Sequence, residues 1–273
     1  MSNVLSPRQI ASIRPNLIAA FYTVLVVLPL TISCEALPTR PDYYPEPMIQ
    51  KIPYMVRIEN QYGIFRGTGF VVSRKGLVLT VSHVVRYNSP IRAILNGKVY
   101  MAKTVFDDPV LDMTLIRLPL DGQSLEIQIP CFWVSDSTRS GDTVIVLGER
   151  QQGGVVVIPA YMVSWASFHI WPGFYRDVMR IYPANPRNSP KPGFSGGPIF
   201  NIQKYVIGLF CCFESLIDRY YNGIPSSRII SKLKETEWLK EMCTVSENQP
   251  YPLPGLTYDI KRVSSEKALP VYP

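Results

Sequence analysis

Between residues 54 and 212 the chain is a succession of short runs rich in β-branched and aromatic residues, interrupted by Gly, Pro, Asn and Asp. Such runs are typical of β-strands, and no amphipathic helical stretch lies between them. Strands are therefore expected at 54–59, 63–72, 77–82, 91–95, 98–106, 111–118, 128–134, 143–148, 154–165, 177–182, 198–202 and 205–212. This pattern predicts an all-β fold, either a sandwich or paired barrels.

The strand-rich region divides near Asp121-Gly122-Gln123-Ser124 into two parts of similar size, about 54–123 and 124–225. After them, apolar residues recur at mostly helical spacing, and Ser226 or Ser227 is a candidate N-cap, so a helix is expected over about 226–242. We expect one folded domain over 54–243. It would lie between a proline-rich linker at 37–53 and a proline-rich tail at 244–273.

Residues 17–32 form an uncharged apolar run that follows Arg8 and Arg14. A helix of this length measures about 24 Å, which is shorter than a hydrocarbon core of roughly 30 Å, and Pro29 shortens it further. Segment 1–36 is therefore expected to be a signal peptide. An uncleaved membrane anchor through residues 17–32 and a lipid-modified Cys34 are the alternatives. In each case the folded domain would lie outside the cytoplasm.

The charge and the metal-ligating residues exclude several classes of function. The chain has a net charge of +7, but no basic run reaches five residues and no aromatic-basic module is present, so nucleic-acid binding is not expected. With two histidines and no CxxC spacing, neither a metal site nor another cofactor is expected. Without the first 34 residues, four cysteines remain: Cys131, Cys211, Cys212 and Cys243. One or two disulfides or free buried thiols fit them, and the pairing is left open.

Three segments carry chemistry and occur in one order along the chain. The first ends in Thr80-Val81-Ser82-His83, the second begins at Asp112, and the third is Gly193-Phe194-Ser195-Gly196-Gly197-Pro198. A serine hydroxyl is a poor nucleophile unless an imidazole takes its proton, and that imidazole needs a partner that fixes its tautomer. We therefore expect His83 to be the general base, Asp112 its orienting partner and Ser195 the nucleophile.

Other residues of the same types compete for these roles. His169 lacks comparable flanking residues and is expected to be structural, while Asp107 and Asp108 belong to an ordinary Asp-Asp-Pro turn. Glycines on both sides of Ser195 allow the backbone to turn sharply there. The N–H groups of Gly193 and Ser195 are therefore expected to converge on one point as an oxyanion hole.

These segments resemble the trypsin-like serine protease superfamily, and more closely its bacterial HtrA-like (Deg-type) branch. The similarity covers roughly residues 54–215 and includes Gly67-Thr68-Gly69-Phe70 and Val206-Ile207-Gly208-Leu209. It implies two six-stranded antiparallel β-barrels followed by a C-terminal helix, with the active site in the cleft between the barrels. It also implies a serine endopeptidase that forms an acyl-enzyme with protein or peptide substrates. HtrA-like proteins usually carry a PDZ domain, for which 244–273 is too short.

Two departures from the family pattern bear on activation and specificity. Phe194 stands where digestive members have an aspartate that pairs with a newly cut N-terminus, so no such zymogen cleavage is expected. Ser189 stands where a preference for Lys or Arg would need a carboxylate, and Cys211 and Phe213 are bulky for a pocket strand. The predicted pocket of Ser189, Cys211 and Phe213 would take a small or medium apolar side chain. The alternative function is a catalytically inactive homologue that acts as a binding module; no oligomeric state is predicted.

Overall fold

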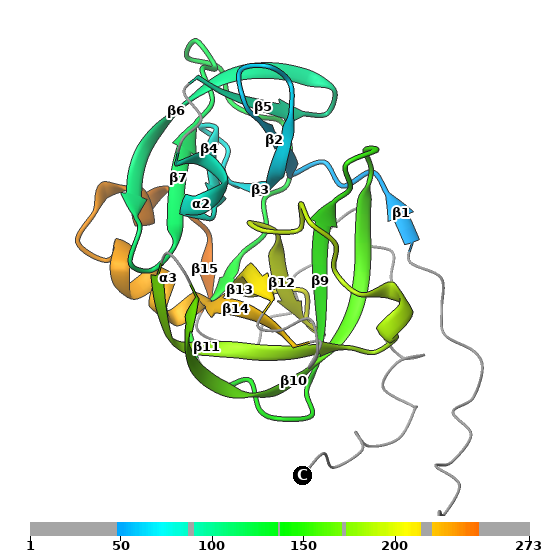
Figure 1. Cartoon of the computed structure of the whole chain (residues 1–273). Helices are drawn as coiled ribbons and strands as arrows, with labels where there is room; N and C mark the ends of the chain where they lie inside the picture. Colours follow the sequence, from blue (N-terminus) through cyan, green and yellow to red (C-terminus); the bar gives the residue numbers. More distant parts are fainter. Residues whose placement is uncertain (1–47, 87–89, 136, 171–172, 214–219, 246–273) are drawn as a thin grey trace, which may run out of the picture. The chain divides into compact units, whose positions relative to one another are not determined.

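The computed structural model describes residues 48–245, except for 87–89, 136, 171–172 and 214–219. The first barrel is drawn in blue to green in the upper part of Figure 1. Its antiparallel strands close in the order β2-β3-β4-β7-β6-β5. They are β2 (Met55–Glu59), β3 (Phe65–Ser73), β4 (Leu77–Thr80), β5 (Ile91–Leu95), β6 (Lys98–Asp108) and β7 (Met113–Arg117).

The second barrel closes because β12 pairs with both β9 and β13, which completes the ring β9-β10-β11-β14-β13-β12. Its strands are β9 (Thr143–Glu149), β10 (Val155–Ile170), β11 (Gly173–Pro183), β12 (Pro198–Asn201), β13 (Val206–Phe213) and β14 (Tyr221–Pro225). Three short strands attach to it: β1 (Met48–Gln50), β8 (Phe132–Trp133) and β15 (Thr244–Val245). The prediction of two six-stranded antiparallel barrels is confirmed.

The apolar runs of the sequence correspond to strands that are covered on both faces. In β9, Val144 and Val146 pack in the core inside the second barrel, whereas Ile145 and Leu147 pack in a core that also includes residues of the first barrel. Successive side chains of a strand point to opposite faces, so only a continuous apolar run satisfies both cores. Two closed sheets pack face to face in this way.

The predicted C-terminal helix begins where expected but is shorter than expected. Helix α3 spans Ser226–Leu233, and a separate 3₁₀ helix, η3, spans Glu237–Glu241. The expectation of one helix to residue 242 is therefore wrong, because Thr236 donates both its N–H and its hydroxyl to the carbonyl of Leu233 and closes the helix there. Ser226 is not a cap: its hydroxyl donates to the carbonyl of Trp133 at 2.5 Å.

The structure pairs two of the four cysteines whose pairing the sequence leaves open. Cys131 and Cys243 form a disulfide, while Cys211 and Cys212 are free thiols. The disulfide lies beside the parallel pair of β8 and β15, so it ties the segment after η3 to the connection between the barrels. It closes a loop with a sequence separation of 112 residues, and a disulfide typically stabilises a fold by about 2–4 kcal/mol, more for longer loops.

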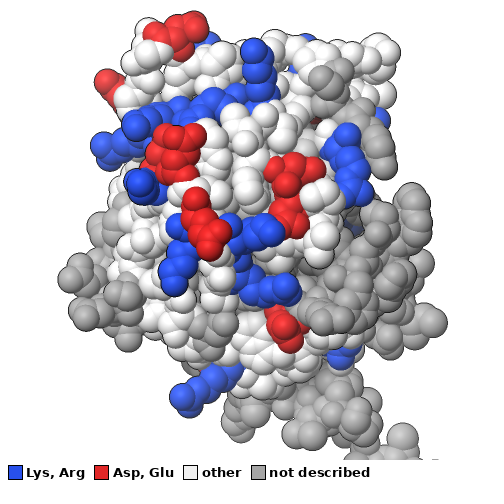
Figure 2. Space-filling view, turned by 90° about the vertical axis from the view of Figure 1, so that its left-hand side faces the viewer, with Lys and Arg blue, Asp and Glu red and all other residues white. Residues whose placement is uncertain are grey.

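No helix in the described part of the chain is both long and apolar enough to cross a membrane. The predicted signal or anchor segment 17–32 and most of the predicted tail lie outside the described residues. Figure 2 turns the side of β6, β7 and α3 toward the viewer and shows Lys and Arg interleaved with Asp and Glu. On this face the positive charge of the chain is therefore mixed with negative charge.

An ion pair joins α3 to the first barrel. The ammonium of Lys232 lies 2.6 Å from Oδ2 of Asp108, at the end of β6. Burial alone would raise the pKa of Asp108, but Lys232 and the N–H groups of Leu111 and Val110 together hold it below its ordinary value. A carboxylate whose pKa is lowered by folding stabilises the fold above its unfolded pKa of about 3.9, and this contribution is lost as the pH falls through the folded pKa.

Replacing Lys232 by methionine should therefore destabilise the protein in a pH-dependent manner. We expect Lys232→Met to lower the free energy of unfolding by about 0.5–1 kcal/mol at pH 7, since the lysine is half exposed. The difference from wild type should shrink as the pH falls from about 5 toward 2. Urea unfolding at several pH values measures it, with Lys234→Met, an exposed lysine at the end of the same helix, as the control. A loss that is the same at all pH values would contradict the role of the ion pair.

Candidate active site

The structure brings His83 and Asp112 into direct contact. His83 belongs to α2 (Ser82–Val85), and its Nδ1 lies 2.8 Å from Oδ2 of Asp112, while its backbone N–H donates to Oδ1 at 3.0 Å. Because a carboxylate only accepts, this contact assigns the proton of the neutral imidazole to Nδ1 and leaves Nε2 as an acceptor. Asp112 is 4% exposed, whereas the side chain of His83 is 36% exposed, so the pair has one buried and one accessible end.

Asp112 has an uncommon backbone conformation. Its φ is +55°, and β7 begins only at Met113, two residues after the start of the strand predicted at 111–118. Positive φ in a non-glycine residue is uncommon but is tolerated by aspartate, and such residues concentrate at functional sites. The carbonyl of Asp112 also accepts the N–H of Ser82 at 3.2 Å. Asp112 therefore holds the start of α2 with both its backbone and its side chain.

The competing residues lie in other surroundings. Asp107 accepts hydrogen bonds from the hydroxyls of Ser82, at 2.6 Å, and Thr114, so it supports the residue before His83. Asp108 is engaged by Lys232 and by the N–H groups of Val110 and Leu111. His169 lies in β10, where its backbone is paired with Phe174.

Ser195 lies in a loop of two consecutive turns. The N–H of Phe194 donates to the carbonyl of Lys191 at 3.1 Å, with Gly193 at a φ of +104°. A proline in the second position and a positive φ in the third define a type II turn. In the following turn Gly197 donates to the carbonyl of Phe194, and Gly196 has a φ of +90°. A side chain at Gly196 would collide with the carbonyl of Thr68, which explains the glycine on the far side of Ser195.

The loop keeps two N–H groups available. Within the described part of the chain, neither the N–H of Gly193 nor that of Ser195 donates a hydrogen bond to a protein acceptor. The N–H groups of Phe194, Gly196 and Gly197 all do. Since buried N–H groups are nearly always paired, two unpaired donors two residues apart in a half-buried loop suit a site that receives an acceptor from outside.

Phe194 fixes this loop to the second barrel through its side chain. The ring is 1% exposed and lies directly over the Cα of Gly148 in β9. It also contacts Phe210 with ring centroids 6.4 Å apart, and Phe210 in turn packs on Tyr221 at 6.0 Å. Burying a phenylalanine contributes roughly 1.5–3 kcal/mol. At this position a hydrophobic contact therefore holds the loop in place of an ion pair.

Gly67 lies where the three sequence segments converge. A Cβ on Gly67 would lie 2.6 Å from Cγ2 of Val84, the residue after His83, and 2.9 Å from the carbonyl oxygen of Ser195. The next residue, Thr68, donates its N–H to the same carbonyl at 2.9 Å. Through Gly67 and Thr68, strand β3 of the first barrel therefore contacts the loop of the second barrel that carries Ser195.

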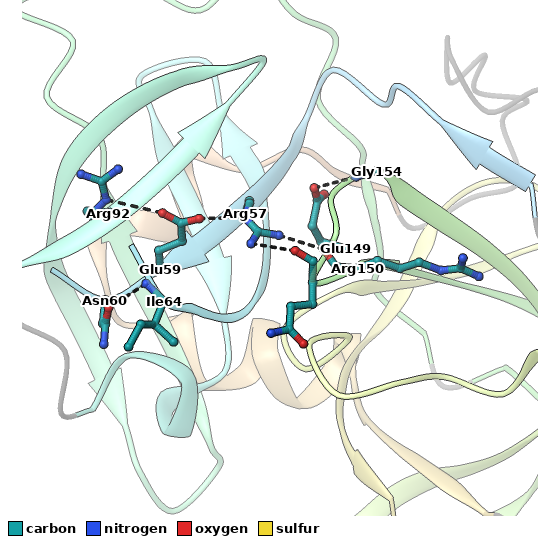
Figure 3. A network of polar contacts seen from close by, with 9 residues as sticks. Arg57, Glu59, Asn60, Ile64, Arg92, Glu149, Arg150 and Gly154 are labelled. Carbon is teal, nitrogen blue, oxygen red and sulfur yellow. Dashed lines mark hydrogen bonds and ion pairs between the residues drawn. The ribbon is translucent and has the colours of Figure 1, made fainter. Parts of the chain in front are cut away.

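Arg57 in β2 makes a further connection between the barrels, which Figure 3 shows from close by. Its guanidinium donates to the carbonyls of Arg150, at 2.8 Å, and Gln151, at 3.1 Å, in the turn between β9 and β10. Its Nε pairs with Glu59 at 2.9 Å, and Glu59 also pairs with Arg92 at 3.5 Å. Arg57 is thus oriented by carboxylate contacts in the first barrel and bonded to backbone of the second.

The same arginine supports the surroundings of Gly193. Its guanidinium carbon lies 4.1 Å from the ring centroid of Phe65, and that ring occupies the space that a side chain at Gly193 would need. The carbonyl of Glu149 also lies beside Gly193; burial raises the pKa of the Glu149 carboxyl above its ordinary value, although Arg57 and the N–H of Gly154 oppose the shift. Phe65, Arg57 and Glu149 are residues near the site that the sequence analysis did not single out.

The predicted specificity residues have different exposures. Ser189 is half-buried directly after a short 3₁₀ helix, η2 (Pro186–Asn188), Cys211 is fully buried, and Phe213 is 51% exposed at the end of β13. Tyr221 lies opposite Phe213 on β14 and is 9% exposed. The sequence does not predict β14, because its segment, Tyr-Asn-Gly-Ile-Pro, contains residues that are rare in strands.

Comparison with known proteins identifies the family. The sequence matches the trypsin-like peptidase domain over residues 67–209, a range that includes His83, Asp112 and Ser195. The chain belongs to the trypsin-like peptidase family. It is 34% identical over 177 residues to a probable periplasmic serine endoprotease, DegP-like, of Chlamydia trachomatis, which covers 62% of this chain and 33% of that protein. A protein of the same description from Marinomonas sp. is 31% identical over 144 residues, covering 52% of this chain and 29% of the relative.

This trypsin-like peptidase chain thus matches about a third of the length of these relatives. Among solved structures, the active form of the Rv3671c protease from M. tuberculosis is similar with a TM-score of 0.55 at 19% identity, over 78% of this chain and 97% of that one. The HtrA-type protease AlgW with a decapeptide has a TM-score of 0.58 at 17% identity, over 72% of this chain and 67% of that one. At these identities the likeness concerns the fold alone.

Proposed function

We propose that this trypsin-like peptidase is a serine endopeptidase that hydrolyses protein or peptide substrates through an acyl-enzyme. The observation that carries the proposal is the double contact of Asp112 with His83, through the ring Nδ1 and the backbone N–H. That contact prepares Nε2 of the imidazole to accept a proton, which is the property a serine nucleophile requires of its base.

In the proposed mechanism, Nε2 of His83 takes the proton of the Ser195 hydroxyl as the oxygen attacks the substrate carbonyl. Asp112 stabilises the imidazolium that forms and keeps the ring oriented. The imidazolium then protonates the leaving amine, which leaves an ester on Ser195. A water molecule, deprotonated by the same imidazole, hydrolyses this ester and releases Ser195.

The N–H groups of Gly193 and Ser195 are the proposed oxyanion donors. Their lack of protein acceptors supports this role, since the negative charge develops on the carbonyl oxygen only during the reaction. Removal of a single donor of this kind costs about 10²–10³ in kcat in a comparable serine protease. None of these steps requires a metal ion.

We also propose that the domain acts outside the cytoplasm. Relatives that are 30% or more identical are described as periplasmic, and the Cys131–Cys243 disulfide is of the kind that persists in oxidising compartments. Alkylation of freshly lysed cells before and after reduction tests this, because a cytoplasmic protein would present both thiols without reduction.

Reaction with a fluorophosphonate probe tests the catalytic proposal. Wild type should be labelled at Ser195, and Ser195→Ala should not be labelled. His83→Ala should lose turnover, and Asp112→Asn should lower kcat by up to about 10⁴-fold because it favours the wrong imidazole tautomer.

Two controls make the result specific. His169→Ala removes the other histidine of the chain and should leave most of the activity. Ser73→Ala removes a buried hydroxyl in the first barrel, which bonds Glu241, and should leave labelling intact. A folded wild type that never reacts would instead support the inactive, binding-only alternative, and equal losses in His83→Ala and His169→Ala would overturn the assignment of the base.

A further inference from the structure

We propose that Thr68 is a positioning residue, whose hydroxyl holds Gly193 and Ser195 in register with His83 across the boundary between the barrels. This role rests on the proposed function, because it concerns the placement of the nucleophile and the oxyanion donors. Thr68 does not itself contact the reacting atoms in this proposal.

Every polar group of Thr68 has a partner at this boundary. Its hydroxyl donates to the carbonyl of Gly193 at 2.6 Å and accepts the N–H of Glu149 at 2.8 Å. Its N–H donates to the carbonyl of Ser195 at 2.9 Å, and its own carbonyl accepts the hydroxyl of Thr80 at 2.7 Å. The residue is 0% exposed, so none of these bonds competes with solvent.

The pattern of these bonds selects two particular residues of the loop. Thr68 binds the carbonyls of Gly193 and Ser195, the same two residues whose N–H groups are the proposed oxyanion donors. Thr68 is in β3, which reaches the first-barrel helix of His83 through the contact of Gly67 with Val84. A fixed distance between these groups matters, because a misplacement of about 1 Å can cost about 10²-fold in rate.

A valine at position 68 has nearly the same shape as threonine but lacks the hydroxyl. It would leave the carbonyl of Gly193 and the N–H of Glu149 without their partners in a buried place, while the bond from the backbone N–H to Ser195 would remain. Serine would keep the hydroxyl and lose only a methyl group. The pair of variants therefore separates hydrogen bonding from packing.

We expect Thr68→Val to lower kcat by about 10- to 100-fold with KM nearly unchanged, and Thr68→Ser to restore most of kcat. The affinity for a peptide boronate, which mimics the tetrahedral intermediate, should fall in proportion to kcat/KM, whereas the affinity for a product peptide should not. Ser73→Ala, a lost hydroxyl in the same strand, should change the free energy of unfolding without changing kcat.

Thr68→Cys, whose thiol is a weak donor, gives an intermediate loss and serves if the valine variant does not fold. A folded Thr68→Val with the kcat and boronate affinity of wild type would overturn the role of Thr68, as would an equal loss in Thr68→Ser. A wild type that does not react with fluorophosphonate would overturn the proposed function itself.

A second observation, independent of the first, concerns the two free thiols. We infer that Cys211 and Cys212 form a modification site, where a peroxide oxidises the adjacent thiols to a vicinal disulfide. Adjacent residues of a regular strand point to opposite faces. Here the two sulfurs lie only 3.3 Å apart, because the pairing of β13 with β14 shifts register between Phe210 and Cys212.

The two thiols differ in accessibility, which orders the reaction. Cys212 is half-buried, whereas Cys211 is fully buried and donates to the carbonyl of Asn222 at 3.3 Å. Burial, then the neighbouring Cys212 and the charge of Asp112, raise the pKa of Cys211 well above its ordinary value. Cys212 is therefore the thiol that attacks hydrogen peroxide: an S–O bond forms as the O–O bond breaks, and the departing hydroxide takes up the thiol proton of Cys212 and leaves as water.

In the second step the sulfur of Cys211 attacks the sulfenic acid of Cys212. The S–S bond forms, the S–O bond breaks, and the proton of Cys211 leaves with the hydroxyl as water. Overall, two thiols are oxidised to one disulfide and one peroxide is reduced to two waters. Neighbouring Cα atoms are about 3.8 Å apart, closer than in ordinary disulfides, so this bond should be readily reduced again.

Such a bond would act on the nucleophile loop through one residue. Phe210, directly before Cys211, accepts the N–H of Gly196 and donates its own N–H to the carbonyl of Gly197, each at 2.8 Å. Ring closure must rotate the peptide between Cys211 and Cys212, and this displaces the strand that holds the loop. Oxidation should therefore lower the proposed activity and reduction should restore it.

The test treats the whole protein with hydrogen peroxide, alkylates it and maps its peptides by mass. The tryptic peptide 205–219 of wild type should become lighter by two hydrogen atoms and resist alkylation, with Cys131–Cys243 unchanged. Activity should fall several-fold and return with a mild reductant, whereas Cys212→Ser should keep its activity in peroxide. A peptide that only gains oxygen or still alkylates twice would overturn the site, whatever the activity of the protein.

Discussion

The carbonyl groups of Gly193 and Ser195 are bound by a residue of the other barrel, and the arrangement of the site depends on this interaction. The loop that carries Ser195 is attached to the second barrel through the contact of Phe194 with Phe210. The carbonyls of Gly193 and Ser195, however, accept hydrogen bonds from Thr68 of the first barrel. His83 and Asp112 belong to the first barrel alone. His83 and Ser195, the proposed base and nucleophile, are therefore related by a small number of hydrogen bonds between two closed sheets, and by the packing of Gly67 between them.

This dependence explains several choices of residue that are otherwise unrelated. Gly193 and Gly196 have positive φ and lie against Phe65 and Thr68, so each is required by conformation and by space. Phe194 is a buried ring that packs on Gly148 and Phe210 and so attaches the loop to the second barrel through hydrophobic contacts. Arg57 adds bonds from the first barrel to the turn after β9. The contacts of Gly193, Phe194 and Gly196 fix the residues on both sides of Ser195, which suits a site that is preorganised before substrate binds.

Much of the fold could be predicted from the sequence because its signals are local. Runs such as Leu77–Thr80 and Val144–Leu147 are apolar on both faces, and the Gly-x-Ser-Gly-Gly-Pro segment fixes its own turns. Strand β14 was not predicted because Asn222 and Gly223 are poor strand formers that tertiary pairing with β11 and β13 overrides. The Cys131–Cys243 pair and the bonds of Thr68 join residues that are distant in sequence, and no spacing rule predicts such contacts. Thr68 itself belongs to the Gly-Thr-Gly-Phe motif, but the sequence predicts only that it lies in a strand. The partners of its hydroxyl are known only from the structure.

The proposed mechanism requires that the loop hold the N–H groups of Gly193 and Ser195 toward the carbonyl that Ser195 would attack. A crystal structure of the protein reacted with a peptide boronate tests this directly. We expect a bond from boron to Oγ of Ser195, with one boronate oxygen within about 3 Å of both N–H groups and another within reach of Nε2 of His83. A boronate oxygen turned away from these two N–H groups, or an adduct that forms without contact to His83, would contradict it.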